Sequence, residues 1–451
     1  MNISFHGAVR EVTGSCNLLN VKDDQGQEHR FLIDCGMFQG EHMCGDKNMI
    51  PFAFDPKKIE AVFITHPHAD HTGRLPKLVD GGFQGSIYMT HPCAGLSKIV
   101  LEDAYHIMTE EAQRCGSSVL YGLDDLIKTF QLVKGITYHE EILPAPGIKI
   151  YFHDAGHVLG SAYISVEAEG KRLIFSGDIG NDDVPILPKT EPISRATAVV
   201  CESTYGHRVH EPMTERQTKL REAIEHTMTH KSVLLIPAFS IERTQELLYE
   251  LDRMLENDLH TNMPIYLDSP MAIRATQLYR DFKQYLRFDT PIAQSADKDF
   301  FSFKNLRETL SVDESKTIND APAPKVIIAG SGMMNGGRIM HHLLRYLSDP
   351  TTIVLIIGYQ AHGTLGRRIY EGAKKVHIYG KTIEVKAKTM AIGSFSAHGD
   401  MNKLTRWLQP ENGKIPEKIF LTHGDAEAKE VFATHLRHDL GSEVIIPKFQ
   451  G

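Results

Sequence analysis

Three imidazoles and a carboxylate stand within six positions of this chain, in His66-Pro67-His68-Ala69-Asp70-His71. They directly follow the apolar run 61–64, which predicts a buried strand and places the polar cluster at the carboxyl end of a sheet. Neutral imidazole and carboxylate are donors that suit zinc or a similar divalent metal. In a tight loop, the first two histidines can converge on one cation while the carboxylate and the last histidine turn toward a second. The alternative, a histidine-rich surface loop, requires four donors to fall in this order by accident.

One loop cannot fill two metal sites, so further donors must come from other parts of the chain. His157 lies in a segment flanked by glycines, which let the backbone approach a cation closely. Asp178 follows the apolar run 173–175, and a carboxylate can bridge two cations. His423 follows the apolar run 418–422. Each of these is an ordinary residue when taken singly, but beside the first cluster all three become candidate ligands.

The elements that must position these side chains change in character along the chain. The first 205 or so residues predict many short strands, one helix over 94–114 and a hairpin around 167–171. The clearest strands are 30–35, 61–65, 86–90, 149–153, 162–167, 171–176 and 196–202.

From about residue 211, strands and helices alternate, which predicts a parallel doubly wound sheet. Residues 311–324 are polar and proline-rich and are predicted to form a loop, and strands return from about 375. This change at both ends of the middle section indicates an insertion inside a first domain. The predicted elements are helices 214–230, 241–255, 271–286, 338–347 and 426–440, and strands 232–237, 264–268, 325–329, 352–357, 418–421 and 442–446.

Composition bounds the class of protein. The 451 residues are 41% hydrophobic and 24% charged, as in a globular protein of two or three domains. No stretch approaches the roughly 20 apolar residues of a membrane span, and the start lacks the pattern of a signal peptide. We therefore expect a cytoplasmic protein. The six cysteines include no Cys-x-x-Cys pair, so reduced thiols are expected rather than disulfides or a thiolate zinc site.

The net charge of −8 disfavours a generic nucleic-acid binder with a broad basic surface. It does not exclude a nuclease, because two divalent cations in a cleft reverse the local sign of the charge.

The order of these motifs resembles that of the metallo-β-lactamase superfamily, with Asp34 as its first acidic motif, followed by the histidine cluster, His157 and Asp178. The rest of the chain resembles the β-CASP branch, whose members are nucleases. The resemblance rests on Glu202-Ser203-Thr204-Tyr205-Gly206, Ser394-Phe395-Ser396-Ala397-His398-Gly399-Asp400 and Thr422-His423-Gly424-Asp425, and on similar segments at 237–240, 268–272 and 330–333.

This resemblance implies an α/β protein, a metallo-β-lactamase αββα sandwich with an inserted doubly wound parallel-sheet β-CASP domain. The first part of the sandwich would cover 1–207, the inserted domain 208–374, and the second part of the sandwich 375–451.

The resemblance also implies two Zn²⁺, with Mn²⁺ as the alternative. One cation would be held by His66, His68 and His157 with Asp178 shared, and the second by Asp70, His71, Asp178 and His423. Asp34 would orient the ligand loop from behind. RNA-cleaving members of the branch are similar in carrying histidine at the position of His423, whereas DNA-repair members carry an aliphatic residue. Single-stranded RNA is therefore the expected partner.

The expected chemistry is hydrolysis of RNA phosphodiesters, with Asp70, Glu202 and His398 as the catalytic residues. Two cations about 3.5–4 Å apart can hold a hydroxide that attacks the phosphorus in line. His398 would protonate the leaving 3′ oxygen, leaving a 5′-phosphate and a 3′-hydroxyl. Glu202 would accept the other ring N–H of His398 and raise its pKa. The alternative is that Glu202 and His398 form a structural hydrogen bond between domains.

Contacts to the substrate phosphate are a further expectation. Ser331 lies in a Gly-Ser-Gly segment between a predicted strand and a predicted helix, a geometry suited to cradling phosphate with backbone N–H groups. Arg338, near the start of that helix, could reach the same phosphate, although a solvated arginine is equally compatible with the sequence. No Gly-Lys-Ser/Thr follows, so ATP is not implied.

Two other functions stay open at this point. One is hydrolysis of a small ester or thioester, which an inserted domain roofing the metal cleft disfavours. The other is an inactive scaffold of an RNA-processing complex, which would have lost metal ligands. The sequence leaves open endonuclease or exonuclease action, RNA preference, zinc or manganese, and whether the chain forms a homodimer or joins a complex.

Overall fold

The computed structural model describes residues 1–9, 11–39, 46–182, 184–211, 213–257, 262–287, 299, 301–361, 363–410 and 413–450. The chain divides into two compact units. The first unit comprises Met1–Asp182, Leu187–Val209 and His398–Gly451. The second unit comprises His210–Ala397 with the short segment 183–186. Within the described ranges, no helix is both long and apolar enough to cross a membrane.

The first unit contains two sheets. The six-stranded sheet has the order β1 (Asn2–Phe5), β2 (Asn17–Lys22), β3 (Glu28–Ile33), β4 (Ala61–Phe63), β5 (Ser86–Thr90) and β6 (Val133–Ile136). The seven-stranded sheet has the order β21 (Glu443–Ile445), β20 (Lys418–Thr422), β11 (Ala198–Glu202), β10 (Lys171–Phe175), β9 (Ala162–Ala168), β8 (Ile148–Asp154) and β7 (Ile142–Ala145). The predicted hairpin is the antiparallel pair β9–β10.

Alternating side chains of these strands build three apolar layers. Phe31 of β3 and Phe175 of β10 belong to the core between the two sheets. The residues next to them in the sequence do not belong to this core. Leu32 faces the opposite way, into the core under the helices that cover the first sheet. Ile174 faces the helices that cover the second sheet. Successive side chains of a strand therefore point to opposite faces of the sheet, and both faces are buried. This is what a sheet that packs on another sheet on one side and on helices on the other requires.

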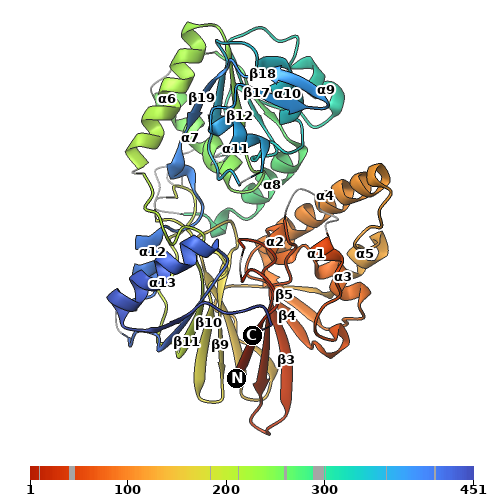
Figure 1. Cartoon of the computed structure of the whole chain (residues 1–451), viewed down its shortest axis with the longest axis vertical. Helices are drawn as coiled ribbons and strands as arrows, with labels where there is room; N and C mark the ends of the chain where they lie inside the picture. Colours follow the sequence, from red (N-terminus) through yellow and green to blue (C-terminus); the bar gives the residue numbers. More distant parts are fainter. Residues whose placement is uncertain are drawn as a thin grey trace. The chain divides into compact units, whose positions relative to one another are not determined.

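The helices flank the sheets on their outer faces, which gives the predicted αββα order (Figure 1). On the side of the six-stranded sheet lie α1 (Asp46–Met49), α2 (Ala69–Thr72), α3 (Leu75–Asp80), α4 (His91–Cys115) and α5 (Leu123–Leu132). On the side of the seven-stranded sheet lie α12 (Met401–Trp407) and α13 (Ala426–Leu440).

Parallel pairing brings the functional segments to one edge of each sheet. In the seven-stranded sheet β10, β11 and β20 run parallel, with Phe175 paired to Val200 and Glu202 paired to Thr422. In the six-stranded sheet β3 and β4 run parallel, with Ile33 paired to Phe63. The loops that follow these five strands therefore begin at neighbouring carboxyl ends.

The second unit is a six-stranded, fully parallel sheet, as the alternation of strands and helices predicts. Its order is β14 (Leu306–Glu308), β13 (Ile265–Asp268), β15 (Lys325–Ala329), β12 (Val233–Pro237), β16 (Ile353–Ile356) and β19 (Lys388–Ala391). Leu235 of β12 lies in a core with Leu343, while its neighbour Leu234 is also fully buried, so both faces are covered. The helices are α6 (Met213–Thr229), α7 (Arg243–Asn257), α8 (Pro270–Asp281), α9 (Val312–Thr317), α10 (Ile339–Tyr346) and α11 (Leu365–Tyr370), and β17 (Lys375–Ile378) pairs with β18 (Lys381–Glu384).

Two features of the second unit differ from the sequence expectation. The chain was expected to return to the first domain at 375, but the second unit continues to Ala397 because β19 pairs in parallel with β16. The segment 311–324 was expected to be a loop, but it contains α9. Ser311 caps this helix: its hydroxyl accepts from the Glu314 N–H, and the Glu314 carboxylate accepts from the Ser311 N–H. This capping box stabilises a helix too short to show apolar periodicity.

Four of the six cysteines have described side chains. Cys16, Cys35, Cys93 and Cys201 are buried and free. The side chains of Cys44 and Cys115 lie outside the described part of the chain.

Candidate metal centre

The histidine cluster is carried by the loop between β4 and α2 and by α2 itself, and Asp34 holds this segment from behind. Asp34 follows β3 with a left-handed backbone, φ 64°. Its carboxylate accepts from the Thr65 N–H at 2.8 Å and from the Thr65 hydroxyl at 2.9 Å. It also lies 2.7 Å from Nδ1 of His71, so Nδ1–H donates to it and the lone pair of Nε2 is presented to the centre.

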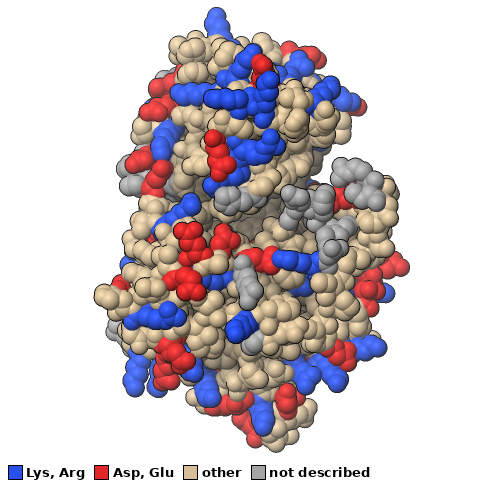
Figure 2. Space-filling view, in the orientation of Figure 1, with Lys and Arg blue, Asp and Glu red and all other residues tan. Residues whose placement is uncertain are grey.

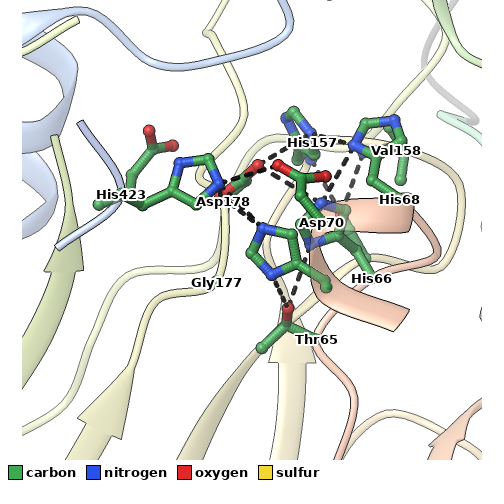
Figure 3. Close-up of polar contacts among 12 residues, drawn as sticks. Thr65, His66, His68, Asp70, His157, Val158, Gly177, Asp178 and His423 are labelled. Atoms are coloured by element: carbon green, nitrogen blue, oxygen red, sulfur yellow. Dashed lines mark hydrogen bonds and ion pairs between the residues drawn. The ribbon is translucent and has the colours of Figure 1, made fainter. Parts of the chain in front are cut away.

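One group of donors comprises His66, His68, His157 and Asp178, whose donor atoms all lie within 4.8 Å of one another. His66 Nε2 is 3.1 Å from His68 Nδ1, and His157 Nε2 is 3.4 Å from the same atom. The Oδ2 atom of Asp178 is 3.4 Å from His66 Nε2. His66 and His68 share the loop after β4, whereas His157 and Asp178 come from two other loops. The side chains point toward one another (Figure 3).

A second group comprises Asp70, His71 and His423. His71 Nε2 lies 3.1 Å from His423 Nε2, which lies 3.3 Å from Asp70 Oδ2. His423 follows β20 and, like Asp34, has a left-handed backbone, with φ 49°. Its N–H donates to the carbonyl of Ala8 at 2.7 Å, which holds the turn in place.

His157 is fully buried in the loop between β8 and β9. The flanking Gly156 and Gly160 have φ of 64° and 76°, in the left-handed region that favours glycine. At Gly160, a Cβ atom would lie 2.7 Å from the Thr90 hydroxyl oxygen and 2.8 Å from the Cys93 nitrogen. The Ser161 hydroxyl accepts from the His157 N–H at 3.0 Å and fixes the loop.

Asp178 lies between the two groups and is 2% exposed. Its Oδ2 faces the first group, and its Oδ1 lies 3.5 Å from His71 Nε2 and 3.6 Å from His423 Nε2. Within the described residues, Oδ1 accepts no hydrogen bond. A buried carboxylate oxygen without a donor, facing ring nitrogens on both sides, is the environment of a cation ligand, because burial without a partner is costly. These donors therefore fit divalent metal ions.

The electrostatics of the cluster agree with this fit. Burial and the surrounding imidazoles hold the pKa of His66 well below its usual value, so His66 is a neutral donor. Burial opposes protonation of His71, but the carboxylates of Asp178 and Asp34 outweigh it and raise the pKa of His71 to about 10. The carboxylates thus favour a positive charge at His71. A divalent cation bound to His71 can provide this charge in place of a proton.

Glu202 and His398 meet beside Asp178. Glu202, at the end of β11, is 1% exposed and accepts from the Ile179 N–H at 2.7 Å. His398 Nδ1 lies 3.3 Å from Glu202 Oε2 and 3.8 Å from Asp178 Oδ2. Burial lowers the pKa of His398, but Glu202 and Asp178 raise it by more, so the net shift is upward. Both residues belong to the first unit, so their hydrogen bond is not one between domains.

Two hydroxyl groups that hold candidate ligands were not predicted from the sequence. Thr65 binds Asp34 and lies 3.1 Å from His66 Nδ1, and Thr204 Oγ1 lies 3.2 Å from His423 Nδ1. Hydroxyls behind metal-binding histidines set the ring orientation. Their only sequence signal is position: Thr65 directly precedes the cluster, and Thr204 stands within the segment 202–206.

Ser331 and Arg338 lie in the second unit, and their groups have internal partners. Arg338 donates to Asp268 at 2.7 Å and to the carbonyls of Thr309 and Leu310. The Ser331 hydroxyl accepts from the Asn335 N–H. The helix α10 begins only at Ile339, so the Gly-Ser-Gly segment is not the N-terminus of a helix as the phosphate cradle requires. Both residues are part of the packing of the second unit.

Comparison with known families agrees with this architecture. The family model of the metallo-beta-lactamase superfamily matches residues 11–237, and that of the Beta-Casp domain matches 244–369. A Zn-dependent metallo-hydrolase RNA specificity domain matches 382–447. The chain belongs to the metallo-β-lactamase superfamily, in the branch that carries a β-CASP domain. Its class is that of the RNA-processing metallo-hydrolases.

Individual relatives match over 93% to 100% of this chain. A ribonuclease of Thermus thermophilus is 38% identical over 449 residues, covering 100% of this chain and 99% of that protein. An RNase J-like protein of Methanocaldococcus jannaschii is 32% identical, covering 99% and 97%. The cleavage and polyadenylation specificity factor subunit 3-I of Arabidopsis thaliana is 30% identical over 93% of this chain and 58% of its own length. A solved structure from Enterococcus faecalis, of unknown function, shares the fold with TM-score 0.57 at 11% identity over 100% of this chain and 98% of its own.

Proposed function

We propose that this protein is a ribonuclease that hydrolyses phosphodiester bonds of single-stranded RNA, leaving a 5′-phosphate and a 3′-hydroxyl. The observation that carries the proposal is the convergence of two donor groups on the buried, unsatisfied carboxylate of Asp178. The ribonuclease named among the relatives, matched over nearly its full length, supports RNA as the substrate.

Two divalent metal ions are part of the proposal. The first ion would be held by His66, His68 and His157, and the second by Asp70, His71 and His423. Asp178 would bind both ions. Zinc suits this nitrogen-rich set, and manganese is the alternative. When bound, such ions supply a hydroxide nucleophile at neutral pH and neutralise the charge that develops on the phosphoryl group.

His398 is the proposed proton donor to the leaving group. Its Nδ1 faces Glu202 at 3.3 Å, so Nε2 is the ring nitrogen turned away from that carboxylate. A proton transferred from Nε2 to the 3′ oxygen accompanies breaking of the P–O3′ bond, so the upstream fragment leaves with a 3′-hydroxyl and the downstream fragment keeps the phosphate on its 5′ oxygen. Glu202 holds the ring and favours its charged form.

The second unit supports binding of a polyanion. Between residues 365 and 390 the chain has seven Lys or Arg and two Glu, although the whole protein has a net charge of −8. Lys374, Lys375, Lys381, Lys386 and Lys388 are all exposed. Figure 2 shows Lys and Arg gathered on the face of this unit where β17, β18 and α10 lie in Figure 1. A local basic surface of this kind contacts phosphates without sequence preference.

The test is cleavage of one labelled single-stranded RNA, the matched DNA and a chromogenic phosphodiester by the zinc- or manganese-loaded protein. We expect RNA cleavage, lost in His398→Ala by roughly 10²–10⁴-fold with the metal content unchanged. His106→Ala, an exposed histidine of α4, is the control. RNAs with free and blocked 5′ ends separate exonuclease from endonuclease action. Turnover of only the small ester, or DNA cleavage equal to RNA cleavage, would contradict the proposal.

A further inference from the structure

A third group of metal-type donors lies in the first unit, and none of its members takes part in the centre described above. It comprises His139, His153 and Glu191, whose donor atoms lie within 4.8 Å of one another. His139 Nε2 is 3.1 Å from Glu191 Oε1, and His153 Nδ1 is 3.7 Å from Glu191 Oε2. They come from three segments: the turn between β6 and β7, strand β8, and the segment that precedes β11.

Each donor is held in place by a separate interaction. The N–H of His139 donates to the carbonyl of Phe152, and His139 has a left-handed backbone with φ 64°. Glu191 is fixed twice to Asp154: its N–H donates to the Asp154 carbonyl, and its carboxylate accepts from the Asp154 N–H. An ordinary surface ion pair does not require such anchoring of its backbone.

The ring of His153 is oriented for binding through Nδ1. Its Nε2 lies 2.9 Å from the hydroxyl of Ser165, on the neighbouring strand β9. When Nε2–H donates to this hydroxyl, the lone pair of Nδ1 faces Glu191. This is the arrangement in which an outer hydrogen-bond acceptor selects the tautomer of a metal-binding histidine.

We propose that His139 Nε2, His153 Nδ1 and the Glu191 carboxylate form a second, separate binding site for a divalent transition-metal ion. Two imidazoles and one carboxylate suit zinc, nickel or copper(II) and are poor ligands for Mg²⁺ or Ca²⁺, which take oxygen. The His139 side chain is 60% exposed, so the site opens to solvent and water completes the coordination. The bound ion links the three segments and thereby stabilises the first unit.

The only tryptophan of the chain, Trp407, reports on this site. Its indole N–H donates to the backbone carbonyl of Glu191 at 3.1 Å. The ring of Tyr163 connects the two, because it stacks on His153 at 4.6 Å and meets Trp407 edge-on at 5.5 Å between ring centroids. A paramagnetic ion bound between His139 and Glu191 therefore lies close enough to quench the fluorescence of Trp407.

The test uses the full chain loaded with only two equivalents of Zn²⁺, which fill the buried centre and leave the site of His139 open, and Ni²⁺ as the probe. We expect saturable quenching of Trp407, and a midpoint at least tenfold higher in His139→Asn and in Glu191→Gln. Asparagine is chosen at 139 because it tolerates the left-handed backbone. His106→Asn is the matched control for loss of an exposed histidine and should behave as the wild type.

Metal content gives an independent readout. After equilibration with Zn²⁺ and gel filtration, the wild type should carry one zinc per chain more than either variant. The RNA-cleaving activity should be equal in all of them, since the metal centre is intact. Equal quenching midpoints and equal zinc content in the wild type and His139→Asn would overturn the proposal. Should Glu191→Gln fold poorly, the exposed His139→Asn alone decides.

Discussion

At the scale of single residues, Asp178 is the group on which the centre depends. Its two oxygens face the two donor groups, one to each side. It is buried, and within the described residues its Oδ1 accepts no hydrogen bond. The cost of burying such a carboxylate is several kcal/mol, on the order of what a bound cation returns. A role as an ordinary buried aspartate, such as Asp268 with its complete set of donors, does not fit Asp178.

The pH dependence of cleavage tests the pairing of Glu202 with His398. The proposed mechanism needs protonated His398, so the rate should be constant below the pKa of His398 and fall as the pH rises through it. Glu202 contributes to the upward shift of this pKa. In Glu202→Gln, which keeps an oxygen for the Ile179 N–H, the alkaline limb should therefore move to lower pH.

The measurement is the pH–rate profile of the wild type and Glu202→Gln at saturating metal, with metal content determined for both. At pH 8 we expect the variant to be slower by up to about 10-fold per unit of pKa lost. A variant that is slower by one constant factor at every pH would show that Glu202 only holds the structure.

At the scale of elements, the ends of parallel strands assemble both the metal centre and the packing of the second unit. Asp268 ends β13 and is fully buried. Its carboxylate accepts from Thr309 Oγ1, Ser315 Oγ, Arg338 Nη1 and His342 Nε2, each at 2.7 Å. It thus connects β13 with α9 and α10. Burial opposes ionisation of Asp268, but these donors outweigh it and lower its pKa to about 2.

We expect Asp268→Asn to destabilise the second unit by about 3–5 kcal/mol, because it leaves a buried cation partly unpaired. A carboxyl pKa lowered from 3.8 to about 2 stabilises the fold above pH 4. That contribution is lost as the pH falls toward 2. The difference in free energy of unfolding between the wild type and the variant should therefore shrink between pH 4 and pH 2.

Denaturant unfolding followed by circular dichroism, at pH 7 and between pH 4 and 2, measures this effect. Asp313→Asn is the control, because the Asp313 side chain is 93% exposed and its ion pair with Lys316 lies on the surface. Equal unfolding midpoints for Asp268→Asn and the control at pH 7 would contradict the prediction.

At the scale of the whole molecule, the chain passes from one unit to the other at segments that adjoin, in sequence, the proposed catalytic residues. His398 is the first residue of the first unit after the second unit ends, and Asp178 lies a few residues before the short segment 183–186. Backbone pairing of Gly180 with His398 and of Tyr205 with Asp400 joins these returning segments within the first unit. The insertion therefore enters and leaves through the loops that carry the site.

Metal removal should affect stability as well as activity. We expect a chelator to abolish cleavage and to lower the thermal midpoint of the first unit, followed by the fluorescence of Trp407, because the buried carboxylates and imidazoles lose their cations. Adding zinc at about 100 times its dissociation constant should raise the free energy of unfolding by about 2.7 kcal/mol per site. Asp178→Ala should respond little to either treatment. A metal-free protein, verified by elemental analysis, that keeps its activity would contradict the metal requirement.

The local pattern of residues determined much of this protein in advance. Short apolar runs bounded by turn residues predict the strands of both units, and the alternation with helices predicts the parallel sheet of the second unit, because these patterns depend only on neighbours in sequence. The motif order predicts the αββα architecture. The short helix α9 was missed because its signal is a single capping box rather than a period.

What only the tertiary structure decided is which distant groups meet. The register of β10, β11 and β20 brings Asp178, Glu202 and His423 together, and no feature of the sequence specifies a register between strands 200 residues apart. The sequence left Arg338 compatible with solvent or with a substrate phosphate, and only the structure shows that it donates to Asp268 at 2.7 Å. The group of His139, His153 and Glu191 has no sequence signal at all. The spacing of residues predicts which side chains within one loop can converge on a cation. Contacts between side chains from different strands depend on the packing of the entire unit.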